Sequence, residues 1–543
     1  MSASSKKQLR NENASAKLTE RQLAEKKEAK KIKIYTNAFV AVLALLIVVA
    51  AYSGITNKIA SSGVYEKKTI AATVGEHQLS NAELSYYYMD GINNFSTTYG
   101  DYAFMYGVDT TVPLDQQVYN PETGETWADS FIAQAVSSAQ ATYALVDAAK
   151  AEGFTLSEDE QMQLDLTISN IDGYASIYGY ENGDAFLKAQ YGNGATKESY
   201  AAYIERNTIA SAYQTAHQAA LTYTDEQIQE ADAANEASYN SYNYNQYYLA
   251  VNKFLTGGTT DAEGNTTYTD EERAAAMAAA EEAANALIDE TVVTVEDLDA
   301  AIAALPINAD VDAASTAYNG QRYASINTYL TEWITDSARQ EGDKTIVPVK
   351  STTTDENGNE VENVTAYYIV YFNGIDANET ELVNVRHILV SFQGQTNEDG
   401  TYTDEAKAVA KEAADSILAE WENGDATEES FAALANERSS DTGSNTNGGL
   451  YENVYPGKTV TNFNDWCFAE GRTAGETAII ETEYGYHIMY FVGDSDITFR
   501  DFQIKSELMT EDVNNWYNGL REAMTVTDGN TEYIIKDLML GQG

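Results

Sequence analysis

VRHILVSF (385–392) and YGYHIMYF (484–491) are the two stretches that decide the fold of this chain. Both are short, rich in β-branched and aromatic residues and bounded by turn residues, a pattern that predicts buried β-strands. Each contains a histidine, His387 and His487, although the chain has only four histidines in 543 residues. A buried strand normally takes apolar side chains. The two histidines are therefore a hydrogen-bonded pair in the core, part of a functional site, or both.

Length and charge limit the class of the protein. At 543 residues the chain is too long for one hydrophobic core, and its 43% hydrophobic content is typical of a folding sequence. The net charge of the chain is −51. Residues 1–33 hold ten Lys/Arg and four Glu, a net charge of +6, so the remaining 510 residues have a net charge of −57. A surface this acidic repels nucleic acid, and no such partner is expected. The single cysteine, Cys467, excludes an intrachain disulfide and a multi-cysteine metal site. We expect no metal and no cofactor.

A membrane anchor is predicted near the start of the chain. Residues 34–57 are 24 consecutive positions without a charge, enough to cross a bilayer as a helix. The basic residues 1–33 precede this run, so the positive-inside rule places them in the cytoplasm and the bulk of the chain outside. A cleaved signal peptide is the competing interpretation. The 33-residue polar lead is long for a signal peptide. We therefore expect an uncleaved, single-pass segment in the cell membrane.

The region that follows is mainly helical in pattern. Within residues 70–242, the stretch 128–153 is a long amphipathic segment that ends at a glycine, as helices often do. Tyrosine is abundant there, and its large ring with a polar tip suits an adaptable contact surface, although ordinary helix packing explains any single tyrosine equally well. Residues 496–543 are predicted to form a helix followed by a short strand.

Two later segments resemble each other. GNTTYTDEERAAAMAAAEEAANALI (264–288) is similar to the segment around Tyr402, and AYYIVYFNG (366–374) is similar to GYHIMYFVG (485–493). A third match lies between these two in order: EWITDSARQEGDKTIVPV (332–349) is similar to DWCFAEGRTAGETAIIET (465–482). Three matches in the same order are not expected from shared composition alone. Residues 243–375 and 380–495 are therefore predicted to be two copies of one unit of strands and helices.

The two copies differ at the histidines. His487 aligns with Tyr368, and His387 falls on Leu249 or a neighbour within YYLAVNKF (247–254), which contains no histidine. If the histidines served only to hold the fold, the first copy would need another solution. The difference favours a functional site in the second copy.

The second copy resembles the parvulin family of peptidyl-prolyl isomerases. The motifs that carry this resemblance occur in the family's order: VRHILV (385–390), SFAALANERSSD (430–441), a glycine pair (448–449), FNDWCF (463–468) and TEYGYHIMYF (482–491). With the predicted anchor and the helical region, the whole chain is similar to membrane-anchored PrsA/SurA-type foldases. This resemblance implies an α+β fold with two tandem parvulin-like domains, each a four-stranded antiparallel sheet with helices. It also implies a helical chaperone module, residues 70–242, completed by residues 496–543.

The resemblance also implies a set of site residues. Its catalytic positions fall on His387, Asp441 and His487. Its substrate-binding positions fall on an aromatic wall and two threonines: Phe463, Phe468, Thr459 and Thr482. The sequence departs from the family pattern twice. GGLY (Gly448–Tyr451) stands in place of a glycine–aspartate–leucine–glycine stretch, and Thr459, or Val460 if the loop shifts by one residue, stands in place of a methionine. These departures predict a wider or more polar pocket.

The function implied is assistance to the folding of secreted proteins outside the cytoplasm. Residues 380–495 would isomerise Xaa-Pro bonds, and residues 243–375 would be an inactive copy. The expected partners are unfolded or partly folded secreted proteins, the membrane through residues 34–57, and a second copy of the chain through the helical module. SFQGQTNEDG (391–400) has no Lys or Arg, so specificity for phosphoproline is not expected. Two alternatives stay open: a holdase without isomerase activity, and a surface scaffold or binding protein on the same fold.

Overall fold

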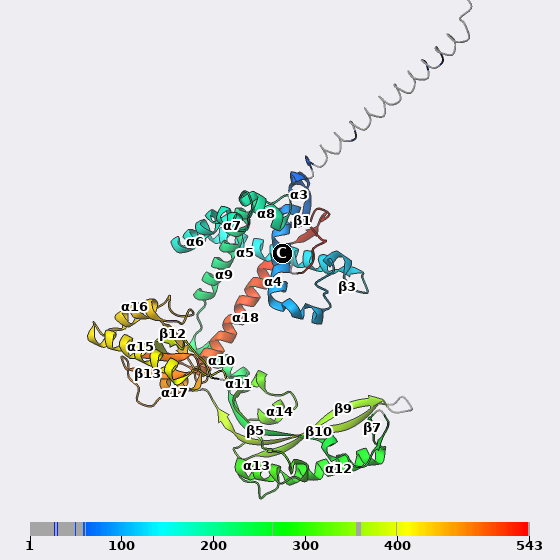
Figure 1. Ribbon diagram of the computed structural model, residues 1–543, viewed down its shortest axis with the longest axis vertical. Helices are drawn as coiled ribbons and strands as arrows, with labels where there is room; N and C mark the ends of the chain where they lie inside the picture. The colour runs from blue at the N-terminus through cyan, green and yellow to red at the C-terminus, as the bar shows by residue number, and fades with distance from the viewer. Residues whose placement is uncertain are drawn as a thin grey trace, which may run out of the picture. The chain divides into compact units, whose positions relative to one another are not determined.

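The computed structural model describes residues 58–59, 61–262, 264–354, 360–397 and 399–540, together with Lys27, Lys30 and Val49 (Figure 1). These described residues form two compact units, one running up to Leu221 and resuming at Glu511, the other running from Thr222 to Thr510. The division falls within the long helix α18 (Phe499–Ala523). Apart from Val49, the membrane span predicted at residues 34–57 lies outside the described residues. Among the described residues, no helix has both the length and the apolar character needed to cross a membrane.

The first unit is built around three helices, α4 (Asn81–Tyr99), α5 (Trp127–Glu152) and α9 (Lys197–Ala220). Thr126 begins α5 with a capping box, and Gly153, in the left-handed conformation, ends it. The helices bury a core rich in tyrosine and alanine, because small alanines let helices approach closely while tyrosine rings fill the space between them.

A small sheet completes the first unit. It has the strand order β15-β1-β2 and is antiparallel: β1 (Ile70–Val74), β2 (His77–Ser80) and β15 (Val526–Asp528). Sequence-distant segments therefore meet in one sheet. The other elements of this unit are α3 (Val64–Lys68), η1 (Gly100–Tyr106), η2 (Leu114–Gln116), β3 (Val118–Asn120), β4 (Glu125–Thr126), α6 (Glu158–Ser169), α7 (Ile171–Ile177) and α8 (Gly183–Tyr191).

The second unit contains two four-stranded antiparallel sheets. The strands of the first are β5 (Ser241–Ala250), β8 (Thr316–Arg322), β9 (Lys344–Thr354) and β10 (Glu360–Asp376), in the order β8-β5-β10-β9. The strands of the second are β11 (Glu381–Ser391), β12 (Leu450–Val454), β13 (Thr477–Thr482) and β14 (Gly485–Thr498), in the order β12-β11-β14-β13. When each set is numbered along the chain, both sheets have the order 2-1-4-3.

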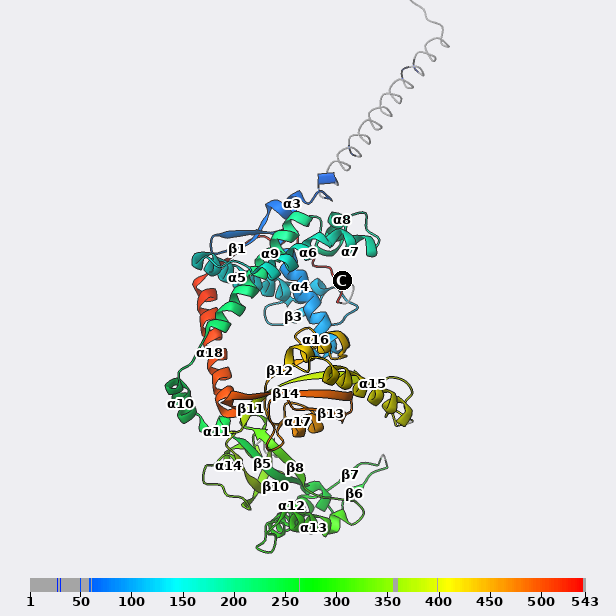
Figure 2. The ribbon, with the colours of Figure 1, turned by 90° about the vertical axis from the view of Figure 1, so that its left-hand side faces the viewer.

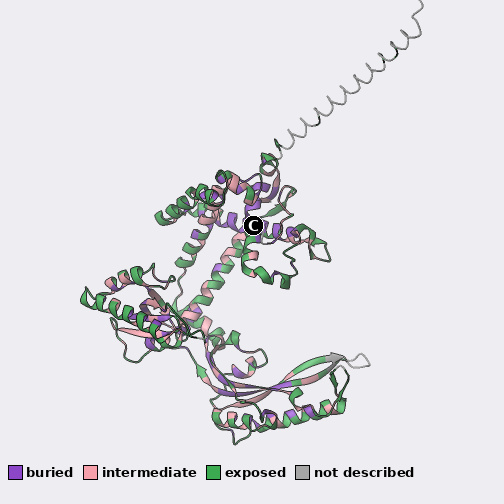
Figure 3. Ribbon diagram, in the orientation of Figure 1, coloured by how far each residue is buried: buried purple, intermediate pink, exposed green. Residues whose placement is uncertain are grey.

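Helices cover both faces of each sheet. In the first sheet, α12 (Asp270–Ala286) and α13 (Val295–Ala303) lie on one face and α14 (Thr331–Ile334) on the other. In the second, α15 (Asp404–Asn423) and α16 (Glu428–Arg438) lie on one face and α17 (Thr461–Cys467) on the other (Figure 2). Buried residues accordingly follow the strands and the inner sides of these helices (Figure 3). The remaining elements of this unit are α10 (Asp225–Ala234), α11 (Glu236–Tyr239), η3 (Val251–Phe254), β6 (Thr259–Thr260), β7 (Thr266–Thr267), η4 (Pro306–Asn308) and η5 (Tyr323–Ser325).

Strand register corrects the sequence alignment of His387. In the second sheet His387 lies opposite Met489, and in the first sheet Gln246 lies opposite Val370. Val370 and Met489 occupy the same place in the aligned segments AYYIVYFNG and GYHIMYFVG. The counterpart of His387 is therefore Gln246, and the assignment to Leu249 or its neighbours was wrong. The error arose because register is set by cross-strand pairing, which the sequence of a single strand does not reveal.

Candidate functional site

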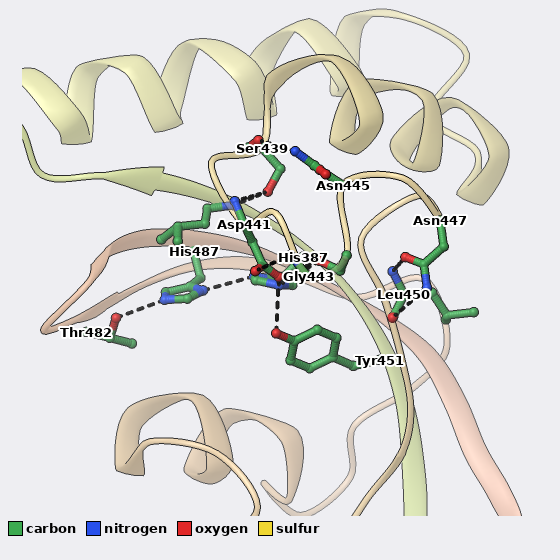
Figure 4. Close-up of polar contacts among 12 residues, drawn as sticks. His387, Ser439, Asp441, Gly443, Asn445, Asn447, Leu450, Tyr451, Thr482 and His487 are labelled. Atoms are coloured by element: carbon green, nitrogen blue, oxygen red, sulfur yellow. Dashed lines mark hydrogen bonds and ion pairs between the residues drawn. The ribbon is translucent and has the colours of Figure 1, made fainter. Parts of the chain in front are cut away.

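The two strand histidines meet on the face of the second sheet that α17 covers. His387 comes from β11 and His487 from β14, and their Nδ1 atoms are 3.0 Å apart (Figure 4). The rings are stacked, with centroids 5.1 Å apart, and the two residues are only 2% and 5% exposed. Tight backbone contacts fix both positions. Glycine is required at Gly449 and Gly485, where a Cβ would lie 2.2 Å from the carbonyl oxygens of His387 and Val390, respectively.

Asp441 reaches the pair from the turn that follows α16. Its Oδ2 lies 2.9 Å from Nε2 of His387 and also accepts hydrogen bonds from Ser444 Oγ at 2.5 Å and Tyr451 Oη at 3.1 Å. Ser439 ties the turn to the sheet, because its Oγ accepts from the backbone N–H groups of both Leu389 and Asp441. The carboxylate is therefore held in place by its own turn and by a side chain of β12 (Figure 4).

The network continues on the far side of His487. Its Nε2 lies 2.8 Å from the hydroxyl of Thr482, which in turn accepts a hydrogen bond from the backbone N–H of Tyr484. A chain of polar contacts thus runs from Asp441 through both imidazoles to Thr482 at the hairpin between β13 and β14.

Burial keeps both histidines neutral at ordinary pH. Desolvation lowers the pKa of His487 to about 4, and the neighbouring His387 adds to that effect. Desolvation likewise lowers the pKa of His387, although Asp441 acts in the opposite direction. Burial of Asp441 raises its pKa, but hydrogen bonds from Ser444, His387 and the backbone N–H of Gly443 outweigh this and hold it at about 2. Asp441 is therefore a carboxylate beside two neutral imidazoles.

These charge states fix the direction of every hydrogen bond in the chain. An ionised carboxylate only accepts, so His387 donates to Asp441 through Nε2–H. Nδ1 of His387 then carries a lone pair and accepts from Nδ1–H of His487. Nε2 of His487 in turn accepts from the hydroxyl of Thr482. A single carboxylate thus sets the tautomers of both imidazoles.

An aromatic wall stands against the histidine pair. The ring of Phe463, on α17, lies 5.4 Å from that of His387 and 5.5 Å from that of His487, nearly perpendicular to both. Tyr451 packs its ring 4.8 Å from His387 and 5.9 Å from Phe463. With these neighbours, Phe463 is only 2% exposed. The site is thus a polar chain backed by a buried, aromatic surface.

The structure brings together most of the residues expected from the sequence. His387, Asp441, His487 and Thr482 form the hydrogen-bonded chain, and Phe463 packs against it. Phe468 is half-buried and packs in the same apolar cluster as Phe463. Thr459 makes no hydrogen bond with the chain, and its buried hydroxyl has no hydrogen-bond partner among the described residues.

Two participants were not foreseen from the sequence. Ser444 follows Asp441 by three residues, a spacing at which a hydroxyl can reach a local acceptor, so the sequence held a weak signal for it. Tyr451 was identified only as a departure from the family pattern, yet its hydroxyl donates to Asp441. Burial and the neighbouring carboxylate raise the pKa of Tyr451 to about 12, so it remains a proton donor.

Other reactive chemistry finds little support at this site. Cys467 is buried, and burial raises the pKa of its thiol to about 12, so it is not a thiolate nucleophile. Among the residues that the structure describes, no group of three or more His, Cys, Asp or Glu side chains is arranged to hold a metal ion.

Known proteins match the same region. Residues 367–493 match the PPIC-type PPIASE domain. A foldase protein PrsA 1 of Listeria innocua is 30% identical over 139 residues, which are 24% of this chain and 40% of that protein. Two PrsA 1 foldases of Listeria monocytogenes match to the same extent. The chain therefore spans less than half the length of these curated relatives.

Solved structures of PrsA were also found. PrsA from Bacillus subtilis is 23% identical, with a TM-score of 0.17, over 26% of this chain and 46% of that one. PrsA from Bacillus cereus is 23% identical, with the same TM-score, over 27% of this chain and 50% of that one. The family match and the curated relatives show that the chain carries a PPIC-type parvulin domain and is similar, over this region, to PrsA foldases.

Proposed function

We propose that residues 380–495 catalyse the cis/trans isomerisation of Xaa-Pro bonds in unfolded proteins outside the cytoplasm. The observation that carries this proposal is the continuous chain from Asp441 through His387 and His487 to Thr482, set against Phe463. Xaa-Pro bonds interconvert over tens to hundreds of seconds, slowly enough to limit folding. A foldase that shortens this step raises the yield of folded protein.

The chemistry requires no nucleophile and no metal. The barrier, about 18–20 kcal/mol, comes from amide resonance that the twisted transition state loses. An enzyme lowers it by binding the twisted amide more tightly than either planar form. A proline ring held near Phe463 would leave the preceding carbonyl free to rotate beside the imidazoles. Dry surroundings favour the twisted amide, because water stabilises the more polar planar forms.

The histidine pair is suited to this role because it is neutral and oriented. Each imidazole has its tautomer fixed, so its dipole needs no reorganisation when the carbonyl rotates. Asp441 acts through His387, which makes the carboxylate a positioning group. This division predicts that the histidines matter more than Asp441 for the rate.

We propose further that residues 243–375 are an inactive copy of the same domain. Support comes from the shared strand order and from Gln246 and Tyr368, which stand where His387 and His487 stand in the second sheet. The resemblance to PrsA-type foldases also supports a client-holding role for residues 70–242 with 496–543, anchoring through residues 34–57, and pairing of two copies through the helical module.

The direct test is the refolding of a client whose folding is limited by proline isomerisation, with the full chain as catalyst. We expect the wild type and His77→Ala to accelerate the slow phase equally, since His77 lies in the other unit, against Asp147. His387→Ala is expected to lose the acceleration. No acceleration by the wild type would refute isomerase activity, and an equal loss in both variants would contradict the assignment of that activity to His387.

A holdase without isomerase activity is the second candidate, and Tyr451 favours it. The ring of Tyr451 packs against Phe463, and its hydroxyl donates a hydrogen bond to Asp441. Tyr451 therefore covers the aromatic wall against which a proline ring would have to bind. In that case the wild type and His387→Ala would both reduce client aggregation, and neither would change the rate of the slow phase.

A further inference from the structure

A cluster of large apolar side chains is exposed in the first unit, between α4 and α5. Phe104 and Met105 are 69% and 71% exposed, and Tyr102, Tyr106, Val118 and Tyr119 are each at least half exposed. We call these six residues the loop patch. The segment that carries them is largely exposed in Figure 3. Soluble proteins leave single apolar residues exposed, but contiguous apolar patches usually mark binding surfaces.

The loop patch borders a groove. The groove has a volume of about 580 Å³, and five of its nine lining residues are aromatic: Phe95, Tyr106, Tyr119, Trp127 and Phe131. Val118, Gly107, Ser130 and Gln134 complete the lining. Its walls support one another, because Trp127 packs 4.9 Å from Tyr119 and 5.6 Å from Phe95, measured between ring centroids. A pre-formed aromatic groove of this size can take a few large side chains without first having to reorganise.

The segment that carries the groove and the loop patch is strongly acidic in sequence. From Thr69 to Ala149 the sequence has ten Asp/Glu and no Lys or Arg. Five of these acids lie in the same stretch as the loop patch: Asp101, Asp109, Asp115, Glu122 and Glu125. Within the part of the chain that the structure describes, none of the five forms an ion pair, whereas the next acid, Asp129, pairs with Lys536. Carboxylates that lack an ion-pair partner, in a segment that also exposes large apolar side chains, attract cations that carry apolar neighbours.

We propose that the groove and the loop patch dock extended, cationic, apolar segments of unfolded polypeptides, in which Lys or Arg alternates with large aromatic or aliphatic residues. The apolar side chains enter the groove, and the cations pair with the carboxylates of this segment and lie over exposed tyrosine rings. This inference names the client class of the chaperone role proposed above and rests on that role. It does not involve the histidine site.

The charge also argues against the other occupants. A second copy of this chain brings the same acidic segment and a net charge of −51, so like charges would meet across such an interface. Anionic lipid surfaces and nucleic acids are repelled for the same reason. A cationic segment is the partner that gains both from burial of apolar surface and from charge pairing.

The test uses the full chain and two short, fluorescently labelled, proline-free peptides. One alternates Lys with Phe and Leu, and the other has Glu in place of every Lys. We expect the Lys peptide to bind at least ~10-fold more tightly by fluorescence anisotropy, with the difference shrinking in high salt. Equal binding of the two peptides, or no binding of either, would overturn the proposal.

Surface variants locate the contact. Phe104→Ser with Met105→Ser should weaken binding of the Lys peptide by ~10-fold or more, because it removes two large apolar side chains from the loop patch. Both side chains are exposed, so the substitutions leave the core of the unit intact. Met162→Ser with Ile177→Ser is the matched control on α6 and α7 of the same unit, where both residues are also exposed. A loss of equal size in the control pair would show non-specific hydrophobic binding and contradict the assignment.

Charge variants and self-association complete the test. Asp101→Asn with Glu122→Gln should reduce both the affinity and its salt dependence. Glu181→Gln with Glu205→Gln, which changes two exposed acids outside this stretch, should reduce neither.

If Phe104→Ser with Met105→Ser abolished dimerisation in sedimentation and left peptide affinity unchanged, the occupant would be a second copy and the proposal would fail. Because the peptides lack proline, His387→Ala should bind them like wild type, so failure of the isomerase proposal is distinguishable from failure of this one.

Discussion

The two sheets of the second unit share one strand order and differ at the residues that face their smaller helices. The second sheet carries His387 and His487 there, joined through Nδ1 atoms and held by Asp441. The first carries Gln246 and Tyr368 at the matching register, and Tyr368 instead accepts a hydrogen bond from Asn327. The same arrangement of strands thus forms without the histidines. The fold alone does not require them, which is the strongest structural argument that they serve a reaction.

Replacing the two histidines of the second sheet by the residues at the matching positions of the first sheet should have the largest effect on activity. In the variant His387→Gln with His487→Tyr, we expect prolyl isomerase activity to fall by ~100-fold or more, because the oriented imidazole dipoles are lost. Activity is measured by NMR exchange on an Xaa-Pro peptide, and the fold by circular dichroism. A folded variant with wild-type activity would show that the histidines are only structural.

Removing the charge of Asp441 should have a smaller effect. Asp441→Asn keeps the shape of the side chain, but its amide group can present either a donor or an acceptor to Nε2 of His387, so the tautomers of the pair are no longer fixed. We expect a loss of about 10-fold in kcat with little change in KM. Imidazole ¹⁵N chemical shifts provide the second readout, and unchanged tautomers in the variant would contradict the positioning role of Asp441.

The buried histidines should also make the stability of the second sheet depend on pH, whereas the first sheet has no histidine at the matching positions. The pKa of His487 is about 4 in the folded chain against 6.5 ordinarily, and that of His387 is lowered too. Below pH 6.5 the unfolded chain therefore binds protons that the folded chain does not, and the free energy of unfolding falls as the pH drops toward 4. The pKa of Asp441 is lowered from 3.8 to about 2, so this carboxylate changes the free energy of unfolding only at a pH lower than the window of the histidines.

Thermal unfolding at pH 7 and at about pH 4.5 checks this window. We expect the wild type to lose more stability between the two values than the variant His387→Gln with His487→Tyr, which lacks both titrating groups. An equal loss in both proteins would mean that the histidines are not buried and neutral.

Much of the second sheet could be predicted from its sequence. The histidines stand in strongly apolar strands, and Asp441 follows a helix in the family's motif, so their meeting was foreseeable. The register of Gln246 was not, because YYLAVNKF gives no local sign of which residue pairs across the sheet. Nor was the hydroxyl of Tyr451 on Asp441, since that contact depends on how β12 lies beside β11.

Tyr451 should give the smallest change in activity. Tyr451→Phe removes only the hydrogen bond to Asp441, whereas Tyr451→Leu also uncovers Phe463, so we expect KM to fall several-fold in the leucine variant and to change less in the phenylalanine variant. Tyr318 is the register counterpart in the first sheet and packs on Tyr244. Tyr318→Leu should leave activity unchanged, and an equal effect at both positions would break the distinction between the sheets.

The most direct test of the account is proline cis/trans exchange measured by NMR on a short Xaa-Pro peptide with the full wild-type chain. We predict that exchange accelerates in proportion to the chain's concentration and that the acceleration disappears in His387→Ala. A well-folded wild-type chain that leaves the exchange rate unchanged would contradict the account, and would make the His387–His487 pair a structural element.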